Sequence, residues 1–495
     1  MKRNRKKSII FAFFVSLFLL AGCMSSPEEN VPDSAPPDAP AVVQEETAAQ
    51  PDSGAEEETP SEPLDETPVP SDDRIELTLT GIGFDLTDGT NPVTGAPYQG
   101  WETFAETIFA NKFPNVTLKL NTIPWENFRA NMQTILQAGD TDLLYASANF
   151  VAPFYDMNLL MDLNPMLEGD PNFVFEAIYP AALRNNLNFT DFSMEKLVSM
   201  PFILGNRIIV YDKQIFDDFA VDYLPEHPTP LDMLDRARRL TGTNPRTGEA
   251  NYGIWWDVAT PNMSWFINPS YYFDAVGVEG SLTDLRNLQW SLNSPEMVQT
   301  SEYLVELSQF TPPGFTTRAG NELWATPENN IGIFFNGNGT QIMSFWLANG
   351  EDDDFLNRWG ATLQLGPNGE GWTVGDGIAM STSVDSNHRD IAWEVLKYIA
   401  GPETQAWWNE QFGPATMPSL DLSHYHPKDI FIPMNLRTYE HARSTPFEEF
   451  NPFFGTDIQP VLSAMITNAA SGISVDVQAE LDALQNMAVE WSRNQ

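Results

Sequence analysis

The chain has almost no cysteine and few basic residues, and each shortage restricts what the protein can be. Cys23 is the only cysteine in 495 residues, so no disulfide can form within the chain. There are 26 Lys and Arg against 68 Asp and Glu, which gives a formal net charge of −42. This charge repels nucleic acid and anionic lipid, so the sequence argues against both as partners. Stability must come from a large core, and 42% of the residues are hydrophobic.

Catalytic and metal-binding motifs are also missing. The sequence has no Gly-x-Ser-x-Gly elbow, no phosphate-binding glycine loop and no metalloprotease motif. His424 and His426 offer two metal ligands without a third at useful spacing, so a solvated loop is the expected role. One enzymatic alternative stays open, because glycoside hydrolases use carboxylate pairs and Glu448-Glu449 lies in a Phe-rich segment. We predict no catalytic residue, no cofactor and no metal.

The N-terminus predicts export and a lipid anchor. Basic residues between Lys2 and Lys7 precede an apolar run from Ile9 to Ala21, which is too short to span a bilayer comfortably. The following Leu20-Ala21-Gly22-Cys23 resembles the lipobox of bacterial lipoproteins, which implies a diacylated Cys23 as the new N-terminus. We therefore expect residues 1–22 to be a signal peptide and the mature protein to be anchored on the outer face of the cytoplasmic membrane.

An acidic linker follows Cys23. Residues 24–73 contain 15 acidic residues, 10 prolines, no Lys or Arg and no aromatic residue. Such a segment cannot bury enough apolar surface to fold, so we expect residues 23–73 to be a disordered tether or a tail without a selected role.

From Arg74 onward, strand and helix patterns alternate. Ile75, Leu77 and Leu79 alternate with polar residues, and Trp101, Phe104 and Ile108 then fall on one helical face. The same alternation continues through the chain. Strands that alternate with helices predict an α/β fold with a mostly parallel sheet covered by helices.

Five sequence pieces, in order, resemble motifs of the extracellular solute-binding proteins of ABC importers, the group that includes maltose-binding protein. The resemblance runs from about Ile75 to the end of the chain. The pieces are Gly139–Leu144, with Thr141 where proline is usual; Met200-Pro201 followed by Ile208–Lys213, with Asp212 in place of the usual asparagine; Pro228–Asp232; Ala392–Glu394 with Gly401–Gln405; and Asn468–Gly472 with Val475-Asp476.

This resemblance implies a type II periplasmic-binding-protein fold, in which hinge-connected α/β lobes enclose a ligand cleft. It places the first crossing between lobes near Pro201 to Asn206, the return near Leu363 to Gly369 and the last crossing near Arg437. We therefore expect lobe 1 to comprise residues 74–203 and 363–436. Lobe 2 would comprise residues 204–362 and 437–495.

The ligand suggested by the residues is a sugar. Sugars have apolar C–H faces edged by hydroxyls, so a binding site needs flat aromatic rings beside hydrogen-bonding groups. The chain places Tyr145, Trp255-Trp256-Asp257, Trp265 and Trp372 beside small polar residues in predicted loops. For any one of 14 Trp, core packing is the alternative.

The resemblance implies binding positions, and the aromatic pattern adds Trp372 to them. Among them, Asp85, Asn149 and Asn206 could equally be turn formers or caps. The predicted ligand-binding residues are Phe84, Asp85, Tyr145, Asn149, Asn206, Trp265, Tyr271, Asn336, Trp372 and Asp376.

These observations lead to one hypothesis and two alternatives. The hypothesis is a monomeric, lipid-anchored receptor that closes on a carbohydrate, most naturally an oligosaccharide, and delivers it to the permease subunits of an ABC importer. The alternatives are a surface glycoside hydrolase and an accessory lipoprotein that senses or adheres without transport.

Overall fold

The computed structural model describes most of the chain after residue 73, within one compact unit, Ser71–Gln495. The predicted signal peptide, Cys23 and the linker lie outside the described residues. Within the described part, no helix is both long and apolar enough to cross a membrane. The described residues are 74–90, 96–124, 128–205, 207–258, 263–317, 319–350, 352–372, 374–439 and 450–495.

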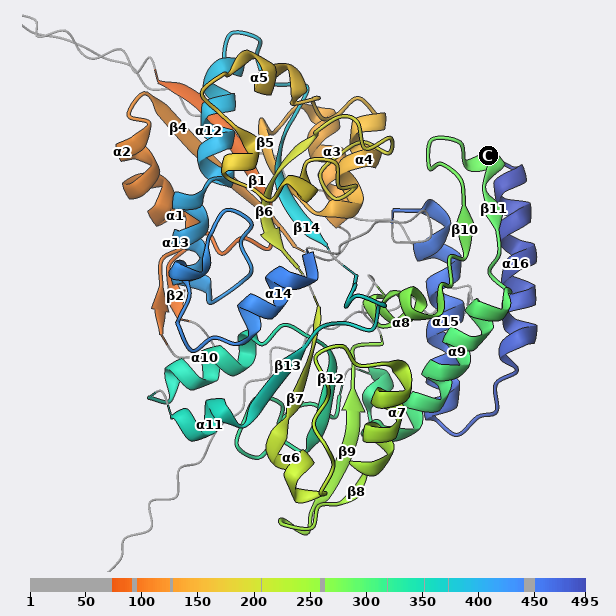
Figure 1. The fold of residues 1–495 in the computed structure, drawn as a ribbon. Coiled ribbons are helices and arrows are strands. Elements are labelled where there is room, and N and C mark those ends of the chain that lie inside the picture. Colours follow the sequence, from red (N-terminus) through yellow and green to blue (C-terminus); the bar gives the residue numbers. More distant parts are fainter. Residues whose placement is uncertain are drawn as a thin grey trace, which may run out of the picture. The chain divides into compact units, whose positions relative to one another are not determined.

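Lobe 1 is built on a five-stranded sheet of order β4-β1-β5-β14-β6 (Figure 1). Strand β1, next to the edge strand β4, pairs in parallel with β4 and β5, whereas β14 runs antiparallel to both of its neighbours. The strands are β1 (Ile75–Ile82), β4 (Val116–Ile123), β5 (Leu143–Ala146), β6 (Ser199–Leu204) and β14 (Gly375–Met380).

Helices cover this sheet because their apolar faces have no other partner. Trp101, Phe104 and Phe109 lie on consecutive helical turns and are all buried in the lobe 1 core. The helices are α1 (Trp101–Thr103), η1 (Phe104–Phe109), α2 (Ala110–Lys112), α3 (Phe128–Ala138), α4 (Ala148–Asp156), α5 (Asn164–Gly169), α12 (Arg389–Ala400) and α13 (Pro402–Phe412), with short 3₁₀ turns η2 (Phe175–Ala177) and η3 (Ala181–Leu183) and a small hairpin of β2 (Gly89–Thr90) and β3 (Pro97–Tyr98).

Lobe 2 has a second five-stranded sheet, of order β13-β7-β12-β9-β8. Only β9 and β12 are parallel, because β7 runs antiparallel to both of its neighbours and β8 forms a hairpin with β9. The expectation of a mostly parallel sheet is therefore wrong for this lobe. The strands are β7 (Ile208–Asp212), β8 (Gly242–Thr243), β9 (Ala250–Trp255), β12 (Ile331–Gly337) and β13 (Trp359–Thr362).

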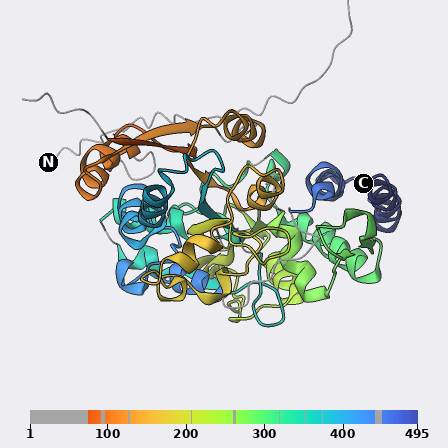
Figure 2. The same cartoon turned by 90° about the horizontal axis from the view of Figure 1, so that it is seen from above.

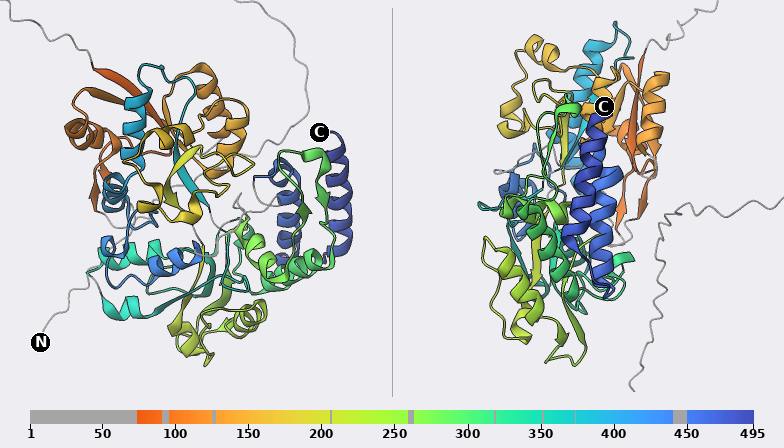
Figure 3. Two further views of the ribbon diagram at one scale, coloured as in Figure 1. Left: turned by 45° about the horizontal axis from the view of Figure 1, so that its top comes forward. Right: turned by 90° about the vertical axis from the view of Figure 1, so that its right-hand side faces the viewer.

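The helices of lobe 2 share one core with this sheet. Helices α9, α15 and α16 pack on one another beside the β10–β11 hairpin, as Figures 2 and 3 show in two further orientations. The elements are α6 (Lys213–Asp218), α7 (Pro230–Arg239), α8 (Ser264–Phe273), β10 (Val278–Glu279), η4 (Leu285–Asn287), β11 (Gln289–Trp290), α9 (Pro295–Leu307), η5 (Ser308–Phe310), η6 (Phe315–Thr317), α10 (Thr340–Ala348), α11 (Asp353–Asn357), η7 (Leu422–His424), α14 (Phe431–Tyr439), η8 (Phe454–Ile458), α15 (Gln459–Ala470) and α16 (Val477–Arg493).

The chain passes between the two sheets after β6, which ends at Leu204, and again after β13, which ends at Thr362, and it leaves lobe 1 a last time after α13, which ends at Phe412. Hydrogen bonds tie these connections together, because Gly205 N–H donates to Val374 O at 2.7 Å and Leu204 N–H donates to Thr416 O at 2.8 Å. Helix α14 packs against β7 and β13 of lobe 2. The same helix also packs on lobe 1, because Ile432 and Leu436 share an apolar cluster with Ile203 of β6 and Trp408 of α13. A last crossing near Arg437 therefore stays a prediction.

Asp212 stands where the family motif usually has asparagine, so its negative charge needs partners in the fold. Its buried carboxylate accepts 2.8 Å hydrogen bonds at both oxygens from Arg358 Nε, and a further bond from Asn329 Nδ2 at 2.8 Å. It also caps α6 by accepting from the backbone N–H of Gln214 at 3.0 Å. The buried charge is thus paired, and the pair joins β7, β13 and the loop before β12.

Candidate functional site

The topology of lobe 2 brings polar residues together at one edge of its sheet. Strands β9 and β12 are parallel, so the residues that follow them, including Asp257 and Asn338, leave the sheet at the same edge. Strand β7 is antiparallel to β12 and pairs Ile208 with Gly337, so Arg207 reaches that edge as well. This edge adjoins the first crossing segment.

A cavity of about 450 Å³ opens there. The described residues that line it come from lobe 2 and from the first crossing, and the strands of the lobe 1 sheet contribute none of them. The lining combines aromatic rings, amides, hydroxyls, one arginine and one aspartate. The lining residues are Arg207, Val210, Trp255, Asp257, Ser264, Asn321, Trp324, Phe334 and Asn336–Ile342.

Strand alternation decides which aromatic residues face the cavity. Phe334 and Asn336 lie on one face of β12 and both line the cavity, whereas Phe335 lies on the other face and is buried in the core. Phe334 is flanked by Trp255 and Trp324, each with its ring centroid 4.8 Å from that of Phe334. The result is a strip of three aromatic rings along the cavity.

A tight turn leads from β12 into α10 at the cavity. Gly339 has a φ of 82°, and a Cβ there would lie 2.0 Å from the Phe431 ring, so only glycine fits. This turn places Asn338, Thr340 and Gln341 on the cavity wall. Amide and hydroxyl groups next to aromatic rings form the combination that recognises a sugar.

Asn336 connects the cavity to the return crossing through buried polar groups. Its side chain lies 3.0 Å from Ser264 Oγ and 3.1 Å from the side-chain amide of Asn268. Asn268 Oδ1 in turn accepts from the backbone N–H of Trp372 at 2.6 Å. The Arg207 guanidinium lies 5.7 Å from the Trp372 ring centroid. The cavity wall and two crossing segments therefore form one connected network.

In lobe 1, three of the predicted residues contact one another. The Phe84 ring lies 5.4 Å from that of Tyr145, and Tyr145 Oη donates to Asp376 Oδ2 at 2.6 Å. Burial, followed by the negative charge of Asp376, raises the pKa of Tyr145 well above its ordinary value, so the phenol remains a proton donor. Phe84 also stacks on Trp101, with 4.5 Å between centroids. Asp85 is exposed beside this group.

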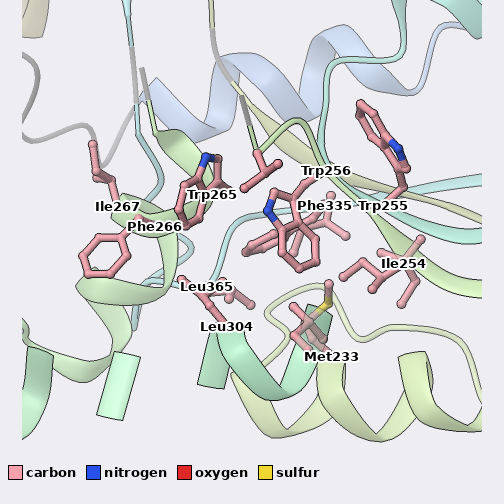
Figure 4. Packing of buried hydrophobic residues seen from close by; sticks show 14 of the residues in the cluster. Met233, Ile254, Trp255, Trp256, Trp265, Phe266, Ile267, Leu304, Phe335 and Leu365 are labelled. Atoms are coloured by element: carbon pink, nitrogen blue, oxygen red, sulfur yellow. The ribbon is translucent and has the colours of Figure 1, made fainter. Parts of the chain in front are cut away.

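Three predicted aromatic residues, Trp265, Tyr271 and Trp372, are buried in this structure. Trp265 and Tyr271 lie within helix α8 instead of a loop, and Trp265 and Trp372 are 0% and 1% exposed. Every residue of α8 from Ser264 to Tyr271 is buried, and its aromatic residues Trp265 and Tyr271 pack into the lobe 2 core (Figure 4, where Trp265 lies among core residues). Trp256 is likewise a core residue, whereas its neighbour Trp255 is buried in the same core and also lines the cavity.

The remaining predictions have different outcomes. Asn336 lines the cavity. Asn206 and Glu448-Glu449 lie outside the described residues, as does the side chain of Asn149. His424 bonds to Asp421 at 3.1 Å and His426 packs on Trp346. In the described part of the chain, no group of three or more His, Cys, Asp or Glu is placed to hold a metal ion.

Sequence reasoning missed several cavity residues, notably Arg207, Asn321, Trp324 and Phe334. Arg207 had one available signal, since it follows the predicted crossing residue Asn206. Trp324 had none, because it reaches the cavity only through the order of the strands.

Comparison with known proteins decides the family. A model of the bacterial extracellular solute-binding protein family matches residues 91–406. The chain belongs to this family. No curated protein matches it.

Solved structures share the two-lobed fold of this solute-binding protein. The sugar-binding protein MalE from Xanthomonas citri has a TM-score of 0.65 at 15% identity, covering 85% of this chain and 98% of that one. Maltose-bound MalE3 from T. maritima has a TM-score of 0.63 at 16% identity, with 84% and 100% covered. An ABC substrate-binding protein from Listeria monocytogenes in complex with cycloalternan has a TM-score of 0.61 at 16% identity, with 85% and 99% covered.

Proposed function

We propose that this solute-binding protein is a lipid-anchored receptor that binds a carbohydrate in the interlobe cleft and delivers it to the permease of an ABC importer. The observation that carries the proposal is the cavity beside the first crossing. There the strip of Trp255, Phe334 and Trp324 adjoins the amides of Asn336 and Asn338.

The chemistry of the cavity favours a neutral sugar. The aromatic strip matches the apolar face of a pyranose, and the amides match its hydroxyls. Only one arginine and one aspartate are among the described lining residues, so the local charges balance. The net charge of −42 disfavours a polyanionic ligand. Among the similar structures, MalE3 is bound to maltose and the Listeria monocytogenes protein to cycloalternan, whereas others are bound to ribitol, α-D-tagatose or D-mannitol. These ligands support a sugar or polyol, and an oligosaccharide is our proposal within that class.

Binding would use both lobes without a chemical step. Lobe 2 would receive the sugar, and rotation about the three crossings would bring the Phe84, Tyr145 and Asp376 side of lobe 1 over it. Hydrolysis has no specific observation in its favour, since its candidate pair Glu448-Glu449 lies outside the described residues. A monomer that presents its closed form to permease subunits fits this mechanism. The anchor rests on the lipobox at Cys23.

A thermal-shift screen against neutral mono- and oligosaccharides tests the proposal. A sugar at about 100 times its dissociation constant should stabilise the protein by about 2.7 kcal/mol, which is a shift of several degrees. The sugar is then recovered and analysed. A shift with unchanged sugar supports a receptor. A consumed sugar would support the hydrolase, and no shift with any sugar would reject a carbohydrate ligand.

A further inference from the structure

Leu187 belongs to lobe 1 but is not buried by it. The neighbouring Leu183, Phe189 and Leu197 are part of the lobe 1 core. Leu187 is only 4% exposed, yet it lies in a separate apolar cluster with Leu282 and Phe450. Its burial therefore depends in part on residues of lobe 2.

The partners of Leu187 sit on a well-anchored part of lobe 2. Leu282 lies in the connection between β10 and β11. The two strands of this hairpin lie beside α15 and α16 (Figure 1). The hairpin is attached to α16, because Trp290 Nε1 donates to Ser492 Oγ at 2.6 Å. Phe450 precedes Phe453, whose ring lies 5.3 Å from that of Trp290. We therefore expect Leu282 and Phe450 to move together with the packed helices α9, α15 and α16 of lobe 2.

The cluster also reaches the hinge. Val374, in the return crossing, packs against it, and Val374 O accepts the hydrogen bond from Gly205 of the first crossing. Phe192 from lobe 1 and Leu285 from the hairpin connection complete the cluster as partly buried members. Leu187 lies on lobe 1 and Leu282 and Phe450 on lobe 2, so a rotation that parts the lobes at this point breaks their contact.

We propose that Leu187, Leu282 and Phe450 form an interlobe latch that stabilises the lobe arrangement of this structure. Apolar burial is lost when the two surfaces part, so the contact favours this arrangement over any in which the lobes have turned away. Through this contact, the β10–β11 hairpin helps to set how the two lobes are placed relative to each other on either side of the cleft.

The latch has a consequence for affinity that rests on the proposed function. The apparent dissociation constant is the intrinsic one divided by the population of the binding-competent state. Leu187, Leu282 and Phe450 would therefore change ligand affinity without contacting the ligand.

Distance measurement between labelled lobes tests the latch without any ligand. Cys23→Ser leaves the full chain without cysteine, so new cysteines can be labelled specifically. Gln137 on α3 and Gln299 on α9 are exposed and report on lobe 1 and lobe 2 respectively. Spin labels at Gln137→Cys and Gln299→Cys give an interlobe distance distribution by pulsed electron resonance.

We expect Leu187→Asn and Leu282→Asn each to broaden and shift this distribution. The matched control is Val276→Asn, which changes an exposed residue just before the hairpin and should leave the distribution unchanged. The double variant should broaden it no further than either single variant, because both remove the same contact. Distributions unchanged by Leu187→Asn and Leu282→Asn would overturn the latch.

Because an asparagine at either position could unfold the hairpin locally, a second experiment uses the milder substitution to alanine. Leu187→Ala and Leu282→Ala are compared with their double variant in urea unfolding, and the latch requires that their effects are not additive. Additive effects would overturn it. Neither experiment uses a sugar, so an unsuccessful ligand screen would leave the latch standing, and a failed latch would leave the proposed function standing.

Discussion

The two sheets face the crossing segments with different surfaces. In lobe 1, Phe84 stacks on Trp101 and Tyr145 donates to Asp376, so these side chains satisfy one another. In lobe 2, the corresponding edge is hollowed by a cavity of about 450 Å³ lined by aromatic rings and amides. The difference indicates a division of labour between the lobes in ligand binding. Lobe 2 supplies the surface that first binds the ligand, and lobe 1 supplies a surface whose side chains already contact one another.

The cavity in lobe 2 requires a stable surrounding fold. Of the interactions tested by substitution, the buried ion pair between Asp212 and Arg358 should contribute most to the free energy of unfolding. Arg358→Met should lower the free energy of unfolding by about 3–5 kcal/mol, because it leaves the Asp212 carboxylate buried without its charge partner. Urea unfolding measures this loss. Arg238→Met is the matched control, since its ion pair with Glu306 is exposed and should contribute less than about 1 kcal/mol.

A second variant separates the charge from the packing. Asp212→Asn restores the residue usual in the family, so combining it with Arg358→Met removes both charges and should recover most of the lost stability. Equal losses in the single and double variants would show that the fold around the cavity does not depend on the ion pair.

The division of labour predicts unequal effects on sugar binding. Trp324→Leu shortens the aromatic strip of lobe 2 and should weaken binding of the sugar identified by the screen about tenfold, or about 1.4 kcal/mol. Phe84→Leu in lobe 1 should weaken binding less than about threefold, because Phe84 is already stacked on Trp101. Titration calorimetry measures both. A larger effect from Phe84→Leu would reverse the assignment of the lobe that first binds the ligand.

Local chemistry explains the parts of the fold that the sequence predicted. The motif at Pro228–Asp232 resembles a family helix start, and Thr229 and Asp232 do form reciprocal capping hydrogen bonds at the start of α7. The alternation of Ile75, Leu77 and Leu79 gives β1, an inner strand of the lobe 1 sheet. In each case the interacting groups lie within a few residues of one another.

The cavity was harder to predict because it is assembled by strand order. Trp255 and Phe334 are far apart in sequence and meet only because β9 pairs with β12. Trp265 and Trp372 have polar neighbours in sequence, yet tertiary packing buries them. A tryptophan beside asparagine or glycine has no local property that distinguishes a binding surface from a core position.

The smallest expected effect on stability and affinity comes from the hydrogen bond between Tyr145 and Asp376 in lobe 1. Tyr145→Phe removes the hydrogen bond to Asp376 and should cost about 1–2 kcal/mol of stability at pH 7. Sugar affinity should change less than about threefold, since the group is already satisfied within lobe 1. Tyr155→Phe is the control, because the Tyr155 hydroxyl bonds to Lys196 near the surface and should contribute less.

The pH dependence of the same variant identifies the cause. The pKa of Tyr145 is raised in the folded protein, mainly by burial and then by the charge of Asp376. The unfolded chain ionises this phenol near pH 10, so above that pH the unfolded state binds fewer protons than the native state. The free energy of unfolding should therefore fall as pH rises above about 10, and the fall should continue up to the folded pKa. Tyr145→Phe should fall less steeply than the parent. If the free energies of unfolding of the parent and of Tyr145→Phe fall in parallel with pH, Tyr145 is not the buried hydrogen-bond donor proposed here.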